Sequence, residues 1–143
     1  MGFKWERELE IGDSLIDSQH RELVSMYNKL LMICASKVGV ERKNKEISEA
    51  IDFLIIYTVT HFSDEEELQM RCGFPGYEEH RALHEEFKQR AAKLYEVFKK
   101  VGFSEDFVTI IKSQVGLWLV THIQTEDSKI APYIQKNQDS QIA

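Results

Sequence analysis

Apolar residues recur along most of this chain at intervals of three and four positions, which is the spacing of an amphipathic α-helix. This pattern predicts four long helices, over residues 18–37, 41–71, 77–100 and 105–130. No segment alternates apolar and polar residues with the period of two that is typical of a β-strand. The pattern therefore predicts an all-α protein.

Residues that favour helix ends fall between these segments. Asp17 or Ser18 can cap the first helix, and Gly39 can end it. Gly102 can end the third helix, and Ser104 can cap the fourth. These positions support the predicted boundaries.

Long helices joined by short loops favour an antiparallel up-down-up-down four-helix bundle. The clearest loop is the segment 72–76, which reads Cys-Gly-Phe-Pro-Gly. With 143 residues the chain has the length of one domain. We expect an extended N-terminal arm at 1–17 and the bundle at 18–131. A polar tail is expected at 132–143, frayed from Lys136, with Pro132 just beyond the last helix.

An excess of acidic residues narrows the choice of partners. The chain has 24 acidic and 18 basic residues, a net charge of −6 and a pI of about 5.4. Nucleic acids and anionic membranes bind basic faces, so neither is an expected partner. Residues 1–17 show no signal peptide, and no apolar run reaches the roughly 18 residues of a membrane span. We expect a cytoplasmic monomer in which Cys34 and Cys72 are reduced.

The five histidines and two of the carboxylates form an ordered pattern. His61 and Glu65 are four residues apart, as are His80 and His84, so each pair points to one side of its helix. Both pairs lie on stripes predicted to face the core, where a polar group without a partner is costly. A shared metal ion would satisfy all four. Imidazole is a common metal ligand, and di-metal sites are built in this way inside bundles.

The remaining members of the pattern are less regular. His122 and Asp127 are five residues apart, which separates them by about 140° on a regular helix. Either Asp127 reaches around the helix, or the helix is locally distorted. His20 has no second ligand on its helix and, taken alone, is typical of an ordinary core residue. The acidic neighbours of Glu65 are assigned to a solvated face: Asp64, Glu66 and Glu67. The complete set in one order nevertheless favours a metal site over separate structural roles.

The pattern H…HxxxE…HxxxH…HxxxxD, from His20 to Asp127, resembles that of the hemerythrin family, and in particular its single-domain bacterial members, the bacteriohemerythrins. The flanking residues are also similar to the family: Ile16-Asp17-Ser18-Gln19 before the first histidine, His61-Phe62, Glu65-Glu66, Phe74-Pro75, Trp118-Leu119 and His122-Ile123. The five-residue spacing before Asp127 is that of the family motif. The resemblance implies the same fold and a bacterial source.

The resemblance also implies a centre of two iron ions. His80, His84 and His122 would bind one iron. His20 and His61 would bind the other iron, which then keeps an open position. Di-iron enzymes of ferritin-like bundles instead use paired Glu-x-x-His motifs, which are absent from these helix faces. The histidine-rich set therefore favours binding over oxygenation.

Glu65 and Asp127 would bridge both irons beside an oxo or hydroxo ligand. The implied function is reversible O2 binding, for oxygen carriage, storage or delivery, and not catalysis. The alternatives are an O2- or redox-sensing module and a di-iron enzyme that acts on peroxide or NO. Four apolar residues flank the ligands and are expected to line a dry O2 pocket: Phe62, Trp118, Leu119 and Ile123.

Overall fold

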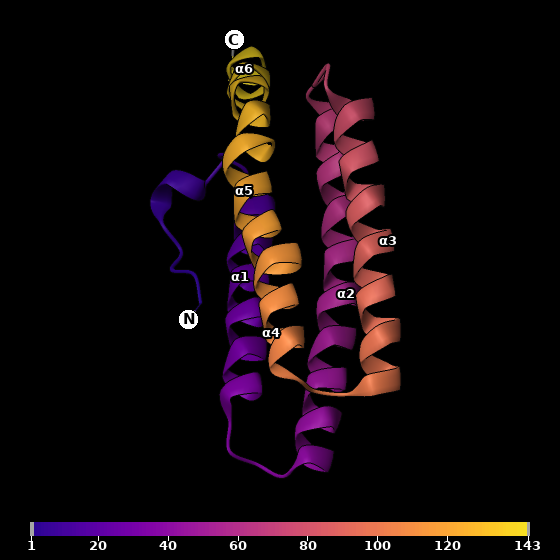
Figure 1. The fold of residues 1–143 in the computed structure, drawn as a ribbon. Coiled ribbons are helices and arrows are strands. Elements are labelled where there is room, and N and C mark those ends of the chain that lie inside the picture. The colour runs from indigo at the N-terminus through magenta and orange to yellow at the C-terminus, as the bar shows by residue number, and fades with distance from the viewer. Residues whose placement is uncertain (1, 143) are drawn as a thin grey trace.

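The protein is a bundle of four antiparallel rods, each a long helix or a succession of short ones (Figure 1). The structure is a computed structural model, which describes the backbone of residues 2–142 and the side chains of residues 2–136. The first three rods are single helices: α1 (Ser14–Ala35), α2 (Val40–Arg71) and α3 (Tyr77–Val101). The fourth rod is a succession of short segments: α4 (Glu105–Ile111), the π-helix η2 (Lys112–Leu117), α5 (Trp118–Thr125), the 3-10 helix η3 (Asp127–Ile130) and α6 (Ala131–Ile142). The predicted all-α fold with four helices is confirmed.

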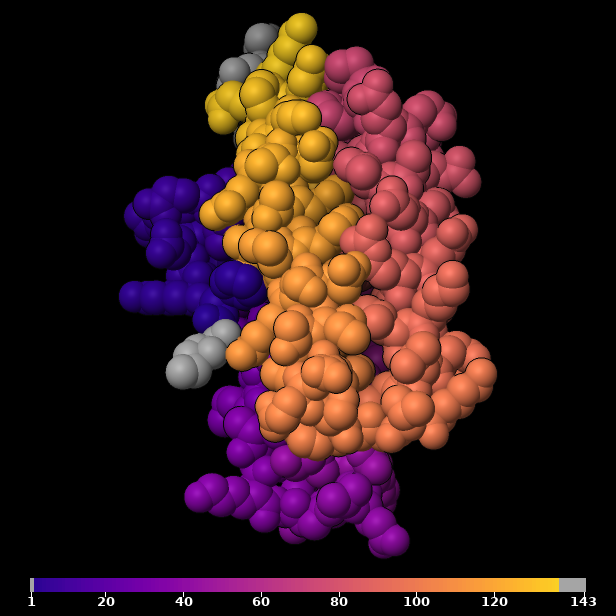
Figure 2. Space-filling view, in the orientation of Figure 1, coloured from indigo at the N-terminus to yellow at the C-terminus, as the bar shows by residue number. Residues whose placement is uncertain are grey.

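The fourth rod covers one face of the molecule between α1 and α3. Figure 1 shows a gap between the ribbons of this rod and α3, and Figure 2 shows that side chains fill most of it.

Among the described residues, no helix is long and apolar enough to cross a membrane.

The first helix begins earlier than expected, because Asp13 caps it. The Asp13 carboxylate accepts a hydrogen bond from the backbone N–H of Ile16 at 3.0 Å. The prediction of Asp17 or Ser18 as the cap was wrong. Asp17 lies inside α1, where its carboxylate accepts hydrogen bonds from the N–H groups of Ile11 at 2.7 Å and Gly12 at 3.1 Å. Asp17 thus ties the N-terminal arm to the bundle.

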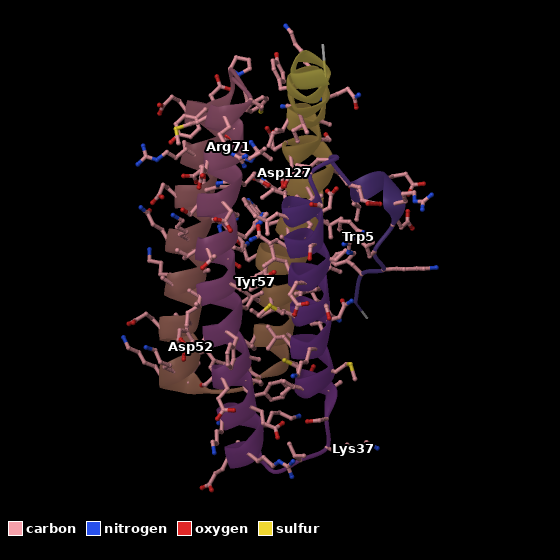
Figure 3. The ribbon with its side chains drawn as sticks, turned by 180° about the vertical axis from the view of Figure 1, so that it is seen from behind. Trp5, Lys37, Asp52, Tyr57, Arg71 and Asp127 are labelled. Atoms are coloured by element: carbon pink, nitrogen blue, oxygen red, sulfur yellow. The ribbon has the colours of Figure 1, made fainter. Side chains whose placement is uncertain are left out.

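The arm is held along α1 by further contacts. It contains one turn of 3-10 helix, η1 (Arg7–Leu9), and Leu9 is buried. The backbone N–H of Phe3 donates to the Asn28 Oδ1 at 2.8 Å, and the Asn28 amide donates back to the Phe3 carbonyl at 2.6 Å. Trp5, labelled in Figure 3, lies on this arm beside α1.

The glycines and the serine that were expected at helix ends behave differently from one another. Gly102 ends α3 with φ +74°, a left-handed conformation that favours glycine. Ser104 caps α4, since its hydroxyl accepts from the N–H of Phe107 at 3.1 Å. Both predictions are confirmed. Gly39 does not end α1, which stops at Ala35; it precedes α2 instead.

The end of the chain corrects the expected polar tail. Pro132 was placed beyond the last helix, but it is the second residue of α6. Proline is tolerated there because the first turn of a helix leaves its N–H groups without intrahelical acceptors. The helix continues to Ile142, so residues 132–142 are helical rather than frayed. The assignment of residues 1–143 to one domain stays a prediction.

Two apolar clusters occupy different levels of the bundle, with a polar level between them. The larger cluster includes Leu54 and Phe62 of α2, and the smaller one includes Leu68 together with Ile16 and Ile130. Between Leu54 and Leu68, α2 carries buried polar side chains. The bundle therefore encloses a polar layer that its apolar surroundings separate from water.

Candidate metal centre

Every rod contributes to a cluster of seven buried side chains. They share very low exposure, at most 5%: His20 of α1, His61 and Glu65 of α2, His80 and His84 of α3, His122 of α5 and Asp127 of η3. The structure thus brings together all seven residues that the sequence pattern singled out. Figure 3 labels Asp127, which lies in the upper half of the bundle.

Glu65 stands between two groups of histidines. Its Oε1 lies 3.0 Å from the Nε2 of His80 and 3.2 Å from the Nε2 of His84. Its other oxygen, Oε2, lies 3.2 Å from the Nε2 of His20 and 3.4 Å from the Nε2 of His61. Each oxygen of one carboxylate therefore faces a different group.

Asp127 repeats this arrangement from the opposite rod. Its Oδ1 lies 2.8 Å from the Nε2 of His80 and 3.0 Å from the Nε2 of His122. Its Oδ2 lies 2.9 Å from the Nε2 of His20. The cluster thus divides into a three-histidine set and a two-histidine set, each with all its ligand atoms within 4.8 Å of one another, and both carboxylates belong to both sets.

Two changes of helical pitch bring His122 and Asp127 into the same cluster. The π-helix η2 precedes α5, and α5 ends at Thr125 before η3 begins at Asp127. The sequence spacing left two alternatives, an Asp127 side chain that reaches around a regular helix or a helix that is locally distorted. The structure shows the second. The rod changes from α-helix to 3-10 helix between the two ligands, so both side chains point inward.

Hydrogen bonds from outside the cluster orient two of the imidazoles. The His61 Nδ1 lies 2.9 Å from the Gln19 Oε1, and the Gln19 amide donates to the Asp64 carboxylate at 2.8 Å. The His84 Nδ1 lies 2.8 Å from the Glu66 Oε2. Amide and carboxylate oxygens accept only, so both Nδ1 atoms donate a proton outward and both Nε2 atoms face the cluster, where a metal ion could bind them.

These outer contacts correct the assignment of Asp64 and Glu66 to a solvated face. Both are partly buried and hydrogen-bonded, whereas Glu67 is exposed as expected. Gln19 was also missed as a partner of His61. No periodic signal identifies such residues, because each has its partner on a neighbouring helix. The nearest clue was their position next to a ligand: Gln19 precedes His20, and Asp64 and Glu66 flank Glu65.

Aromatic rings cover the three-histidine side of the cluster. Phe62 stacks on His84, with ring centres 3.8 Å apart and planes 7° apart. Trp118 stacks on His122 at 4.5 Å and 10°. Leu119 and Ile123 are buried in the same apolar cluster as Phe62. The four residues expected to line a pocket thus lie in the apolar surroundings of the site, although their role toward O2 stays a prediction.

Electrostatics show what the cluster lacks without a cation. Burial alone lowers the pKa of His20, but the adjacent, negatively charged carboxylates of Asp127 and Glu65 outweigh it and raise that pKa to about 10. The same opposition raises the pKa of His80 to about 9. Although burial opposes it, the surrounding histidines hold the pKa values of Glu65 and Asp127 below their usual range. The two carboxylates therefore stay ionised and attract positive charge.

The donor atoms fit a pair of metal ions. Both Asp127 oxygens and the His84 Nε2 are buried without a hydrogen-bond partner, because their short contacts lack hydrogen-bond geometry. Metal–ligand bonds of about 2.1 Å at right angles would place neighbouring donors about 3.0 Å apart. The contacts of 2.8–3.4 Å within each set have this size. A cation in each set could bind these donor atoms in place of the protons that His20 and His80 hold without it.

Comparisons with known proteins agree with this geometry. The sequence pattern of the hemerythrin HHE cation-binding domain matches residues 12–134. Bacteriohemerythrin of Stenotrophomonas maltophilia is 32% identical over 92% of this chain and 80% of its own length. Bacteriohemerythrin of Aquifex aeolicus is 29% identical over 85% of this chain and 89% of its own.

The fold comparison leads to the same family. A crystal structure of wild-type hemerythrin superposes with a TM-score of 0.77 at 27% identity, covering 92% of this chain and 97% of that one. That protein is a hemerythrin, and residues 12–134 of this chain match the hemerythrin family. This chain belongs to the hemerythrin HHE cation-binding family.

Proposed function

We propose that this protein binds O2 reversibly at a centre of two iron ions and so carries, stores or delivers oxygen. The observation that carries the proposal is the unequal division of the cluster. His80, His84 and His122 with two carboxylates give one ion five side-chain ligands, and His20 and His61 with the same carboxylates give the other ion four. If both ions took the same number of ligands, the ion in the two-histidine set would have more room for an exogenous ligand such as O2.

Iron would supply the redox chemistry and the open position at which O2 binds. The side chains would set its surroundings. Two ferrous ions bring four positive charges, and Glu65, Asp127 and one hydroxide offset three of them. The neutral imidazoles add no charge, so the buried centre carries little net charge. Gln19 and Glu66 would hold His61 and His84 in the ligating tautomer.

Iron content and optical spectra test this proposal directly. The purified protein would be reduced without oxygen, exposed to O2 and then purged, with iron measured in the same sample. We expect two irons per chain and a visible band that appears with O2 and disappears on purging. Rapid, irreversible oxidation would favour the redox-sensor or enzyme alternatives. A protein that holds no iron would contradict the proposal.

Replacing Gln19 with alanine should weaken metal binding by roughly 10–100-fold, the usual effect of losing a hydrogen bond to a ligand. His61 would lose the acceptor for its Nδ1 proton, and Asp64 would lose its donor. Competition with a chelator measures the affinity. Ser18→Ala changes the exposed neighbour on the same helix and should leave the affinity unchanged. Equal affinities for the two variants would remove Gln19 from the support of the centre.

Replacing Leu119 with serine should speed the oxidation of the O2-bound protein several-fold. Leu119 is 6% exposed within the apolar cluster, and a hydroxyl there would admit water to the site. The decay of the visible band after mixing with O2 measures the rate. Leu117→Ser makes the same substitution on the same rod at a side chain that is 57% exposed, and should have no effect. Matching decay rates in both variants would show that Leu119 does not protect the site.

A further inference from the structure

An apolar cavity of about 260 Å³ lies in the bundle below the metal centre. It is enclosed mainly by α2, α3 and the fourth rod. Most of the side chains that line it are aliphatic. They include Ile51, Leu54, Ala91, Leu94, Ile111 and Val115. None of the four residues expected to line the O2 pocket contributes to its lining, so the cavity is a separate space.

The polar side chains that reach this cavity already have partners. The Thr58 hydroxyl donates to the Leu54 carbonyl at 2.6 Å. The Tyr95 hydroxyl donates to the Ser48 carbonyl at 3.4 Å, and the Lys88 ammonium donates to the Glu85 carboxylate at 2.8 Å. A buried water needs two to four polar partners, which this lining does not offer. The lining therefore offers few groups that could hold a water molecule, and it favours apolar molecules.

The size of the cavity suits small apolar molecules. An engineered apolar cavity of about 150 Å³ in another protein stays dry and takes up benzene or xenon. O2 is smaller than either and lacks a charge or a dipole. A cavity of about 260 Å³ with this lining can hold it without breaking a hydrogen bond.

Phe87 connects the cavity to the metal centre. Its ring forms part of the cavity wall and stacks on Trp118 at 4.1 Å and 21°. It also meets Phe62 edge-on at 6.0 Å and 80°. Trp118 and Phe62 in turn stack on the ligand imidazoles of the three-histidine set. A continuous group of aromatic rings thus leads from the cavity wall to the ligand imidazoles.

The other side of the cavity approaches solvent. Val59 of α2 and Ala92 of α3 belong to its lining and are exposed, with Val59 at 42%. These residues lie on the two helices whose side chains meet at this edge. The cavity therefore comes close to the protein surface between α2 and α3.

We propose that this cavity takes up O2 from solvent and supplies it to the metal centre past Phe87. The proposal rests on the proposed O2-binding function, because it gives the cavity the same ligand. Movement of the Phe87 ring would open the way to Trp118 and Phe62.

Filling the cavity tests the proposal. Ala91→Phe places a ring in the cavity, and Ala82→Phe makes the same change at an exposed position of α3 as the matched control. Xenon is the probe for uptake, followed by 129Xe NMR on the metal-loaded protein. Stopped-flow mixing of the reduced protein with O2 gives the association rate.

We expect xenon to bind the wild type and Ala82→Phe but not Ala91→Phe. The O2 association rate of Ala91→Phe should fall by about threefold or more, with iron content unchanged. Phe87→Leu removes the ring and should raise the O2 association rate. Its expected effect is thus opposite to that of Ala91→Phe. Ala91→Leu is a smaller filling that serves if the phenylalanine variant does not fold.

Two results would overturn the proposal. Wild-type protein that binds no xenon would show that the cavity does not take up gas. Loss of xenon binding without a change in the O2 rate would show that the cavity is not on the route to the metal. Failure of the proposed function is seen separately, because reduced wild-type protein would then not bind O2 at all, whatever the xenon measurement gives.

Discussion

Replacing Glu65 with alanine should abolish binding of both metal ions. Glu65 directs Oε1 to His80 and His84 and Oε2 to His20 and His61, so its loss removes a ligand from each set. The variant should also unfold more easily, since removing one member of a buried ionic group typically costs about 3–5 kcal/mol. Metal analysis and urea unfolding measure the two effects.

Glu67→Ala is the matched control for this variant. Glu67 lies two residues further along the same helix, and its side chain is exposed. This control should keep two irons per chain and the stability of the wild type. A Glu65→Ala protein that retained two irons and an unchanged spectrum would disprove the bridging assignment.

Metal-free protein should lose stability as the pH rises from about 6.5 to about 10. The pKa of His20 is raised from 6.5 to about 10 in the folded protein, and that of His80 from 6.5 to about 9. A histidine whose pKa is higher in the folded protein than in the unfolded chain stabilises the fold fully at pH values below its unfolded pKa of 6.5. This stabilisation is lost as the pH rises through its pKa in the folded protein. The loss should be on the order of several kcal/mol.

The carboxylates give the opposite slope at acid pH. The pKa values of Glu65 and Asp127 are lowered, so their contribution is present above their unfolded values of 4.5 and 3.8 and disappears as pH falls further. Stability without metal should therefore be highest between about pH 4.5 and 6.5. Urea unfolding of chelator-treated protein across this range measures the profile.

The variant His20→Asn isolates the contribution of one imidazole to this profile. It should unfold with a smaller loss between pH 6.5 and 10, because one of the two raised groups is gone. A stability that stays constant or rises over this interval in the metal-free wild type would contradict the assigned charge state of the cluster.

The sequence predicts the helices well because apolar spacing reflects burial along an entire helix. Helix ends are predicted less reliably because several residues can serve as caps. Asp13, Asp17 and Ser18 could each cap α1, and the contacts of the arm decide in favour of Asp13, since Asp17 is occupied by Ile11 and Gly12. Local preference cannot distinguish these roles before the arm is in place.

The interruptions in the fourth rod have no periodic signature either. Gly116 lies in η2, and a Cβ at this position would overlap the ring of Tyr27 from α1. This close approach belongs to the tertiary packing, so a single glycine in a helical pattern does not reveal it. The five-residue spacing before Asp127 was the one local sign of irregular pitch. It predicted a distortion as one of two alternatives, and the structure shows where that distortion lies.

Seven candidate ligands were predictable because histidine is scarce in this chain and four of the seven residues pair at helical spacing. Their supporting residues were not, because Gln19 and Glu66 look like ordinary surface residues until the facing helices meet. A polar residue that serves a neighbouring helix leaves no pattern on its own helix. Such contacts emerge only from three-dimensional packing.

The distribution of the cluster over all four rods has a consequence for biosynthesis. The first member is residue 20 and the last is residue 127 of 143. A chain emerging from the ribosome can form α1 and α2 early, but the cluster stays incomplete until the fourth rod has been made and has docked. Contacts between residues so distant in sequence form late in folding. Iron would therefore be acquired only after the fourth rod has been made, and until then the nascent chain would pass through a stage in which its histidines are still open to competing metals such as zinc and copper.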